Sequence, residues 1–543
     1  MKKAFIVQLI VIGLSSATDI STLPFNTWTS IPIAMDMRGH DGAWGWVAGY
    51  SSATYDKDRG QMLLADGYAD ARRVISIYTD CIYSYDPDSN TMIYRKAHNW
   101  TVVQHTSSYT TDPLPENAAD STPPPHHIYN GFLYVHEKNA LYMMQGANQT
   151  LSAENEVHLR NLWIYPFDTG KWREVAVPFA NMYEGHLRYV PGGGKLFWFS
   201  SGGCSSTTNF WEFDLEAETW TLKHSPPICV YGSESMTDPQ RERIVIWSGG
   251  FGFFSTYFHA YVPSANRLDT ITPSNTGPTP RYYGQILYIN KYDVYMMVNG
   301  CVEPGDWNFA NDAYVYDPRT NLWESCPAPI GASENIIYDG KREAVMYYTR
   351  HPLNYTGVQV VHALRYKRAG APEAAFTASG NASLAVNLDA SASTDSGGSI
   401  TLYEWDFGYG WEAFTPQDSG ITASHAFPRE GAYTVALRVT DNDGRSTIAT
   451  KEVVAGNTAL PGGKHEKTGA LSVYPNPARS AAVISVTGEK TVRVFNVKGE
   501  LMGSLTSVND RAILDATKLA PGIYFIRAGH GRNTIQKTVC VYR

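Results

Sequence analysis

Glu184 and His186 lie two residues apart on one predicted strand, and their side chains could move a proton to or from a bound molecule. A carboxylate beside an imidazole is a common pair for general acid–base catalysis. Together with Arg281, they would suit a hydrolase or a lyase. Alternation along a strand also brings residues 184 and 186 to one side without any catalytic role, so both interpretations stay open.

A second set of residues has the chemistry of sugar recognition. Aromatic rings cover the apolar face of a sugar, while nearby polar groups bind its hydroxyls. The polar residues expected near the first strands also include His126, His127, Glu234 and Glu334. The candidate ligand-binding residues are Trp44, Trp46, Tyr282, Tyr283, Trp307, His40 and Asp41. Packing between neighbouring sheets is the competing explanation for any single aromatic residue among them.

The chain lacks the standard catalytic signatures. No serine has glycines two positions away on both sides, and the "HEK" segments at 136–138 and 465–467 lack the second histidine of a zinc-protease helix. No phosphate-binding loop is present. The two Tyr, two His and one Cys of a copper-radical oxidase cannot be placed on the predicted strands. We expect no cofactor, and copper or calcium stays open although no motif supports either one.

A repeated β element must position these candidate residues. Four segments, "SYDPDSNTM", "EFDLEAETW", "AYVPSANRL" and "VYDPRTNLW", share an aromatic residue, a turn-forming stretch and a large apolar residue. Turn residues in the middle predict a tight hairpin between two strands. Two further strands precede each hairpin, and the unit recurs about every 48 residues. Four strands at that period predict the blades of a propeller.

The repeat resembles that of the kelch family. The resemblance lies in the glycines after the second strand ("SGG" at 201–203 and 248–250) and in the aromatic–Asp–turn–Trp hairpin, and it implies a β-propeller. Six units can be counted, and the last lacks its fourth strand, whereas "FNTWTSIPI" at 25–33 has the pattern of a final strand without a beginning. We predict that this N-terminal strand, with Trp28, closes the last blade of a domain spanning residues 18–368.

Loop lengths indicate which face of such a ring would bind a ligand. The connections between second and third strands and between blades are long, whereas the hairpins on the other face are tight. Binding residues concentrate on loops held by a rigid scaffold. We therefore expect the long-loop face, which carries the aromatic residues, to be the functional one.

Residues 369–456 form a separate unit. The segments "LDASASTDSGGSITLYEWDFGYG" and "SHAFPREGAYTVALRVTDNDGRS" resemble a PKD domain, which implies an immunoglobulin-like β-sandwich. Apolar residues alternate with polar or small ones over 433–440, as expected for a strand that is buried on one side. Trp405 and Phe407 are predicted to be core residues rather than ligands.

The C-terminal residues 469–543 follow a polar linker at 457–468. Their segments "YPNP", "VFNVKGE" and "LAPGIYFIR" resemble the C-terminal sorting domain of type IX secretion cargo. The resemblance implies passage across the outer membrane through the type IX machinery and removal of this domain. It also implies that the rest of the chain is either released or anchored at the cell surface.

The first 17 residues are typical of an export signal. Two lysines precede an apolar run from Ala4 to Leu14, and cleavage is expected after Ala17. The run is too short to span a bilayer, and no later segment is long and apolar enough. A net charge of −8 without any Lys/Arg run excludes the positively charged surface that nucleic acids require. We expect an all-β chain, a six-bladed kelch-like propeller followed by two immunoglobulin-like β-sandwich domains.

Six cysteines in an exported chain allow disulfides. Cys204 and Cys301 occupy equivalent places in the repeat, and Cys229 and Cys326 follow each of them at the same spacing. Disulfides within the repeats and buried thiols both stay open.

Export and the absence of catalytic signatures favour a secreted or cell-surface binding or adhesion protein. Its ring would recognise a carbohydrate or a surface protein. The alternative is a carbohydrate-active enzyme on the same face, either a hydrolase or lyase or a copper-radical-type oxidase. A purely structural surface-layer protein would instead assemble with itself and bind no ligand. The fold by itself does not decide between these functions.

Overall fold

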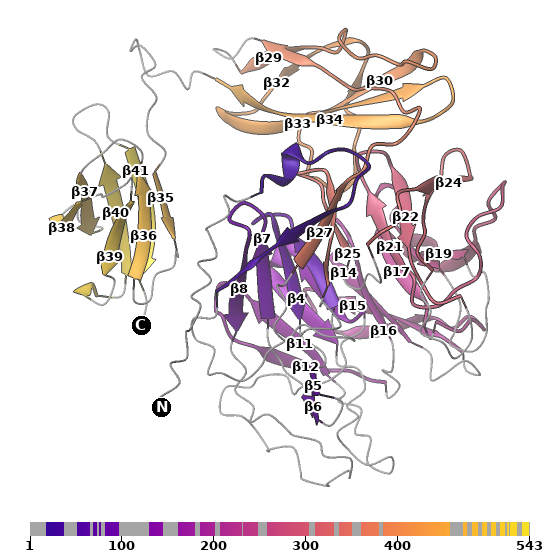
Figure 1. The fold of residues 1–543 in the computed structure, drawn as a ribbon, viewed down its shortest axis with the longest axis horizontal. Helices are drawn as coiled ribbons and strands as arrows, with labels where there is room; N and C mark the ends of the chain where they lie inside the picture. Colours follow the sequence, from indigo (N-terminus) through magenta and orange to yellow (C-terminus); the bar gives the residue numbers. More distant parts are fainter. Residues whose placement is uncertain are drawn as a thin grey trace, which may run out of the picture. The chain divides into compact units, whose positions relative to one another are not determined.

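The computed structural model describes most of the chain between Thr18 and Val541 (Figure 1). The described residues are 18–36, 52–65, 69–72, 75–77, 82–96, 130–144, 161–179, 185–200, 207–230, 232–247, 258–302, 310–330, 336–349, 360–379, 384–456, 471–474, 481–486, 491–496, 501–506, 511–515, 518–520, 522–528 and 535–541. Outside these ranges lie the expected export signal and the candidate residues His40, Asp41, Trp44, Trp46, Glu184, Trp307 and Cys204.

The chain divides into two compact units, Met1–Gly456 and Asn457–Arg543. Their described residues form strands and short 3-10 helices and no α-helix, so the predicted all-β class is confirmed. No helix in the described ranges is long and apolar enough to cross a membrane. The 3-10 helices are η1 (Ile20–Thr22), η2 (His136–Lys138), η3 (Pro239–Arg241) and η4 (Pro263–Ala265).

Six sheets in the described part of the first unit share one plan, in which four antiparallel strands follow one another. They consist of β3 (Ser52–Asp56), β4 (Gln61–Ala65), β7 (Ile82–Asp86) and β8 (Thr91–Lys96); β9 (Phe132–Val135), β10 (Ala140–Met144), β11 (Asn161–Pro166) and β12 (Arg173–Ala176); β13 (His186–Val190), β14 (Lys195–Ser200), β15 (Asn209–Asp214) and β16 (Trp220–His224); β17 (Glu234–Asp238), β18 (Arg243–Trp247), β19 (Phe258–Val262) and β20 (Arg267–Thr270); β21 (Gln285–Ile289), β22 (Val294–Val298), β23 (Ala313–Asp317) and β24 (Leu322–Cys326); and β25 (Ile336–Asp339), β26 (Ala344–Thr349), β27 (Val360–Arg365) and β1 (Thr29–Pro32).

The first strands of these sheets neighbour one another in a closed order. β3, β9, β13, β17, β21 and β25 lie side by side in that sequence, and β25 also neighbours β3. The six sheets therefore surround a common centre, and we call them the ring.

The N-terminal strand β1 joins the end of the ring to its beginning. It pairs antiparallel with β27, with Thr29 opposite Ala363. Asn26 Nδ2 donates to the Lys367 carbonyl at 2.9 Å, and the Lys367 amide donates back to Asn26 Oδ1 at 2.9 Å. Trp28 is buried, with 9% of its surface exposed. Residues more than 300 positions apart thus form one sheet edge.

The chain then continues into the first sheet. β2 (Ala34–Asp36) pairs in parallel with β8, and Asn90 Nδ2 donates to the Pro32 carbonyl at 2.7 Å. The sequence pattern does not predict this strand, because three residues are too few to show a period. The N-terminal segment therefore pairs with the last sheet through β1 and with the first sheet through β2.

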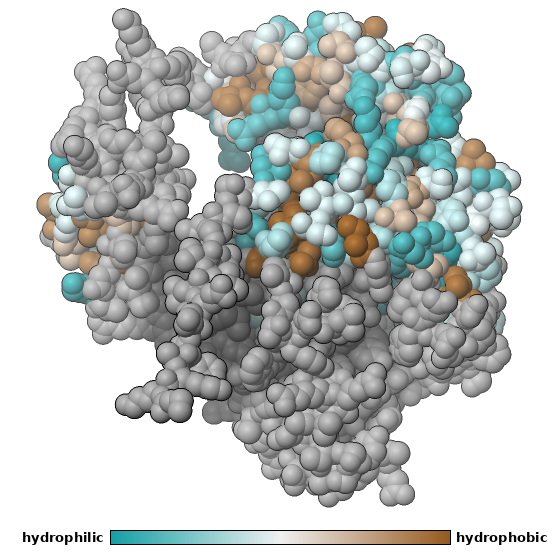
Figure 2. Space-filling model, in the orientation of Figure 1, coloured by the Kyte–Doolittle hydropathy of each residue, from teal (hydrophilic) through white to brown (hydrophobic). Residues whose placement is uncertain are grey.

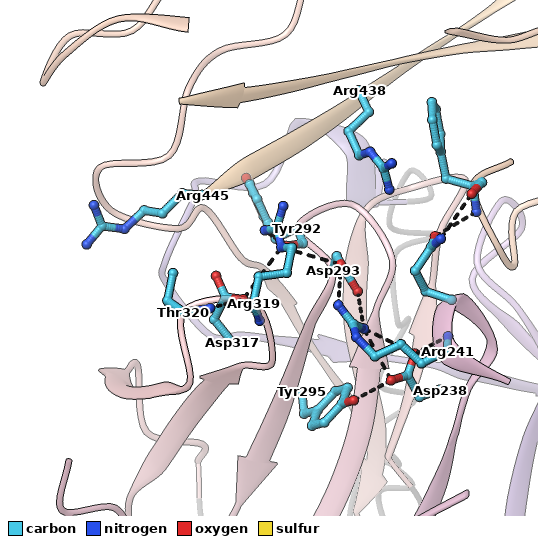
Figure 3. A network of polar contacts seen from close by, with 12 residues as sticks. Asp238, Arg241, Tyr292, Asp293, Tyr295, Asp317, Arg319, Thr320, Arg438 and Arg445 are labelled. Carbon is cyan, nitrogen blue, oxygen red and sulfur yellow. Dashed lines mark hydrogen bonds and ion pairs between the residues drawn. The ribbon is translucent and has the colours of Figure 1, made fainter. Parts of the chain in front are cut away.

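A recurrent Asp-x-x-Arg ion pair, which we call the staple, connects neighbouring sheets. The aspartate ends a first strand, and the pairs are Asp56–Arg59 at 2.7 Å, Asp238–Arg241 at 3.2 Å and Asp339–Arg342 at 2.6 Å. Each arginine also reaches the following sheet. Figure 3 shows Arg241 between Asp238 and Asp293, which lies 2.8 Å away, and Arg342 donates to the Gly60 carbonyl at 3.1 Å.

Apolar side chains between neighbouring sheets form the core of the ring. Trp172 and Trp323 are 3% and 7% exposed. Trp220 is partly buried and packs against a different core cluster, which includes Leu196 and Phe213. In the view of Figure 2, hydrophobic residues on the described surface form small groups among hydrophilic ones.

The rest of the first unit is a two-sheet sandwich. Its sheets are β28 (Thr377–Ser379), β29 (Ala385–Asp389) and β32 (Thr422–Ala426), and β31 (Asp418–Ser419), β30 (Ile400–Asp406), β33 (Gly431–Asp441) and β34 (Ser446–Ala455). Trp405 and Phe407 are core residues, as predicted. Ala436 lies on the expected solvent side of β33 but is fully buried, because Tyr409 and Phe414 of the loop after β30 pack against it.

The second unit also has two sheets, β35 (Leu471–Tyr474), β36 (Ala481–Val486) and β39 (Arg511–Asp515), and β38 (Leu501–Thr506), β37 (Thr491–Asn496), β40 (Gly522–Ala528) and β41 (Ile535–Val541). Ile484, Val492 and Ile526 lie in its core. In the first unit, β5 (Ala69–Arg72) and β6 (Ile75–Ile77) form a separate hairpin.

Candidate functional site

A cavity of about 400 Å³ lies at the centre of the ring. It is lined by residues of all six first strands and of the loop after β30. The neighbouring first strands run in the same direction, as the parallel bridge between Asn130 and His186 shows for β9 and β13. Residues at the strand starts therefore line one end of the cavity, which we call the start end. Residues at the strand ends, beside the tight turns, line the turn end.

Five tyrosines surround the cavity near its turn end, and we call them the tyrosine belt. Each is the second-last residue of a first strand, with Thr237 in the sixth place, and they are Tyr55, Tyr134, Tyr189, Tyr288 and Tyr338. Tyr55 donates to Asp339 at 2.5 Å, and Tyr134 donates to Asp58 at 2.8 Å. Burial raises the pKa of all five hydroxyls, so they remain neutral.

The tyrosine belt is visible in the sequence once its position is known. The first strands end in "TYD", "LYV", "RYV", "LYI" and "IYD". A tyrosine at the second-last place of five strands is a repeat signal in the sequence, in addition to the hairpins. Its function as a cavity lining depends on the closure of the ring.

The start end of the cavity is polar and contains a strained residue. Ser233, Glu234 and Gln285 line it. Tyr283 lines it too, with a φ of 55° that is uncommon for a bulky side chain. Its amide donates to the Gly232 carbonyl at 2.8 Å. Strain of this kind persists only where surrounding contacts enforce it, and it is concentrated at functional sites.

Tyr282 and Tyr283 are the predicted ligand-binding residues that the structure describes, and they differ in position. Tyr283 lines the cavity. Tyr282 is 2% exposed, and its backbone exchanges two hydrogen bonds with Cys301, at 3.1 and 2.8 Å. The two rings meet edge to face, with centroids 5.2 Å apart. Tyr282 thus supports Tyr283 from within the core.

Arg188 places a positive charge beside the cavity. Its guanidinium donates to the carbonyls of Ser235 and Leu187, both at 2.7 Å, and of Asn130 at 3.1 Å. Burial lowers the pKa of Arg188 to about 10, so the side chain is still a cation at neutral pH. It links the backbones of β13 and β17 and gives the cavity a fixed charge near Glu234.

His186, a catalytic candidate, is buried between two sheets. Ser235 Oγ lies 3.0 Å from its Nδ1 and Ser233 Oγ 3.3 Å from its Nε2. Phe199 stacks on the imidazole. Burial, with the nearby charge of Arg188, lowers the pKa of His186 to about 3, so the ring is neutral. It is absent from the described residues that line the cavity.

Arg281, the other described catalytic candidate, lies just before β21, the first strand of a different sheet. It is completely buried, pairs with the Asp312 carboxylate and donates to the Asn299 carbonyl at 3.0 Å. It too is absent from the described lining. The structure therefore gives His186 and Arg281 separate sets of partners, and Glu184 lies outside the described residues.

His136, Glu137 and Glu412 form a cluster whose ligand-type atoms all lie within 4.8 Å of one another. His136 Nδ1 is 2.9 Å from Glu137 and 3.3 Å from Glu412 of the sandwich. Hydrogen bonds to both carboxylates raise the pKa of His136 to about 9. Partial burial by itself would raise the pKa of Glu137, but hydrogen bonds from His136 and Tyr189 lower it to about 2. Ion pairs between the charged imidazole and the two carboxylates explain why these three side chains lie together.

Cys326, in β24, is a thiol. Burial raises the pKa of this thiol. Of the two alternatives left open for Cys326, a disulfide to Cys301 or a buried thiol, the structure shows the thiol.

Comparisons with known proteins identify two domains. Residues 369–455 match the family model of the PKD domain, and residues 472–542 match that of the secretion system C-terminal sorting domain. Both resemblances found in the sequence are confirmed. The type IX sorting domain implies interaction with that secretion machinery, and the chain is a secreted or cell-surface protein.

Two curated relatives share short regions with the chain. A microbial collagenase of Vibrio alginolyticus is 36% identical over 98 residues, which cover 17% of this chain and 11% of the relative. Collagenase ColA of Clostridium perfringens (strain 13 / Type A) is 37% identical over 68 residues, which cover 12% and 6%. The chain thus spans about a tenth or less of the length of these relatives.

Among solved structures, the PKD1 domain of Vibrio anguillarum Epp is similar to part of the chain. The two are 32% identical, and the match covers 16% of this chain and 94% of that domain, with a TM-score of 0.14.

Proposed function

We propose that this protein is a secreted or cell-surface binding protein that takes a carbohydrate into the cavity of its ring. The observation that carries the proposal is the make-up of the cavity. Flat tyrosine faces surround one end, while Glu234, Gln285 and Tyr283 line the other. A volume of about 400 Å³ falls within the usual range of small-molecule sites, ~300–1,000 Å³. Aromatic faces and hydrogen-bonding groups together suit a sugar better than a purely apolar ligand.

The proposal includes the architecture in which the cavity lies. We take the six sheets as the blades of a closed, kelch-like β-propeller spanning residues 18–368, with β1 as the last strand of the sixth blade. The closed order of the first strands and the pairing of β1 with β27 support this. The PKD domain would then span 369–456, the linker 457–468 and the sorting domain 469–543. After removal of the sorting domain the rest would be released or held at the cell surface.

Binding is favoured over glycoside hydrolysis by the positions of the carboxylates. Glu234 and Glu412 are the acidic residues in the described lining, and Glu234 begins β17 whereas Glu412 lies at the turn end. A strand of five residues separates these ends by roughly 13–17 Å. Hydrolysis with two carboxylates requires a separation of roughly 5–9.5 Å.

The experiment that tests the proposal mixes the full chain with insoluble and soluble polysaccharides and measures capture and released products. Tyr283→Ala and Glu234→Gln are expected to weaken capture about tenfold each, because both lie at the start end of the cavity. Leu222→Ala, an exposed change on the outer strand β16, is the matched control and should bind like the wild type. Released reducing ends, unsaturated products or peroxide would instead establish the enzyme alternative. Failure to capture any polysaccharide would reject the proposal.

A further inference from the structure

The loop that follows β30 in the sandwich reaches the centre of the ring. Trp411 and Glu412 belong to the cavity lining, together with Asn290, Gly340 and Lys341, which follow the ends of first strands. The loop therefore lies at the turn end of the cavity, below the tyrosine belt. In this protein the turn end is occupied by a second domain.

Hydrogen bonds hold the loop to the ring at Trp411 and at Phe414. The Phe414 amide donates to Gln240 Oε1 at 3.0 Å, and Gln240 Nε2 donates back to the Phe414 carbonyl at 3.1 Å. Asn290 Nδ2 donates to the Trp411 carbonyl at 2.7 Å. Since these ring residues come from two neighbouring sheets, the loop spans the gap between them.

A further main-chain hydrogen bond and an ion pair complete this junction. The Ile448 amide of β34 donates to the Lys291 carbonyl at 2.8 Å. His136 lies 3.3 Å from Glu412 on another side of the cavity. Contacts from three directions around the axis leave the loop little freedom to tilt away from the cavity.

The backbone of Trp411 shows how strongly its position is determined. Its φ is 68°, in the left-handed region that a bulky residue rarely adopts. A Cβ at Gly340 would lie 3.4 Å from the Trp411 ring and 3.2 Å from Asn290 Nδ2, closer than most such contacts. Glycine at position 340 therefore makes room for the indole. The cost of the left-handed conformation, about 1–3 kcal/mol, must be offset by the contacts of the docked loop.

The sandwich supports the loop from behind with apolar contacts. Tyr409 and Phe414 are buried against Ala436 and Ile448, and Trp411 packs on the same cluster. This is the cluster that buries the expected solvent face of β33. The loop is therefore a rigid part of the sandwich that is placed against the cavity.

We propose that the loop Tyr409–Phe414 is the floor of the ligand site and that Trp411 limits how deeply a ligand enters. The inference rests on the proposed carbohydrate binding. A cavity closed at its turn end accepts a ligand only through the start end. A polysaccharide cannot thread through it, so the site recognises the end of a chain or a short oligosaccharide. The PKD domain is then part of the binding site, and its removal would open the cavity.

The experiment uses the full chain and its Trp411→Ala, Trp411→Phe and Leu402→Ala variants. The probes are cello-, chito-, xylo- and malto-oligosaccharides of two to six units, and their parent polysaccharides before and after partial hydrolysis, which raises the number of chain ends at constant mass. Capture is expected to increase with the number of ends. Trp411→Ala should bind the oligosaccharides about tenfold more weakly, and Trp411→Phe should restore part of the affinity. Leu402→Ala, an exposed change on β30, should match the wild type.

Two results would overturn the inference while leaving the proposed function intact. One is capture that does not depend on the number of chain ends. The other is an oligosaccharide affinity that Trp411→Ala leaves unchanged while Tyr283→Ala lowers it.

If the wild type binds none of the probes, the proposed function fails. Amide hydrogen exchange then tests by itself whether the loop is held against the ring. Replacing Gln240 and Asn290 by alanine should speed exchange at the Phe414 and Ile448 amides. Unchanged exchange at both amides would show that the loop is not held against the ring.

Discussion

The imidazole of His136 forms ion pairs with one carboxylate of the ring and one of the sandwich. It lies between Glu137 of the ring and Glu412 of the sandwich, and Lys57 opposes its charge weakly. Tyr189 donates a second hydrogen bond to Glu137. Because the carboxylates hold the proton on the imidazole, the junction between the domains depends on pH.

We predict that His136→Gln removes a pH-dependent part of the stability. The pKa of His136 is raised from 6.5 to about 9, so its contribution is complete below pH 6.5 and is lost as pH rises through about 9. After allowance for solvent screening, we expect a loss of about 1–2 kcal/mol at neutral pH. Urea unfolding between pH 6 and 10 measures it. Lys138→Gln, which breaks an exposed pair with Glu216, is the control. Equal pH dependence in wild type and His136→Gln would contradict the prediction.

Adjacent residues can differ entirely in their environment. Tyr282 and Tyr283 were one candidate pair in the sequence, yet one is core and the other lines the cavity. The positive φ of Tyr283 breaks the alternation that a strand would impose. Alternation predicted His186 correctly as a strand residue, but its burial against Ser233 and Ser235 comes from the neighbouring sheet.

At the scale of elements, the staples join the sheets. Asp238 is completely buried and accepts hydrogen bonds from Arg241, Arg243 and Tyr295. Its partners come from η3 and from the beginnings of β18 and β22, and Figure 3 shows Arg241 and Tyr295 converging on the carboxylate. The spacing Asp-x-x-Arg is present in the sequence, but only the neighbouring sheet explains why the arginine is needed.

We predict that Asp238→Ala destabilises the ring by about 3 kcal/mol, because it removes the buried carboxylate that two partly buried arginines share. The matched control is Asp269→Ala, which breaks an exposed pair with Arg267 and should cost at most about 1 kcal/mol. Denaturant unfolding of both variants measures the difference. A similar loss in the two variants would show that burial of the staple is not what stabilises it.

Many elements could be predicted because each carries a local period. The hairpins, the glycine-ended second strands and the half-buried strand over 433–440 follow from turn residues and alternation. β2 could not be predicted, since its pairing with β8 connects residues that share no local pattern. Alternation along β33 also fails to predict that Ala436 is buried, because the side chains that cover it belong to the loop after β30.

At the scale of the whole molecule, the C-terminal domain indicates a secreted or cell-surface protein. Residues 472–542 match the secretion system sorting domain. We predict that cells producing a chain that ends at Gly456 retain it, whereas the full chain reaches the surface or the medium. Immunoblots of cell fractions measure this, with Leu222→Ala in the full chain as the control. Equal amounts outside the cell in both cases would mean that export does not depend on this domain.

The sequence by itself determined the all-β class, the PKD and sorting domains and the strands of the repeat. These follow from local alternation, turn chemistry and motifs, which the chain carries segment by segment. Only the tertiary structure decided that five tyrosines share one cavity, that His186 and Arg281 are buried with separate partners, and that Trp411 lies at the turn end. Each of these depends on which distant strands become neighbours, and that is set by the packing of the whole first unit.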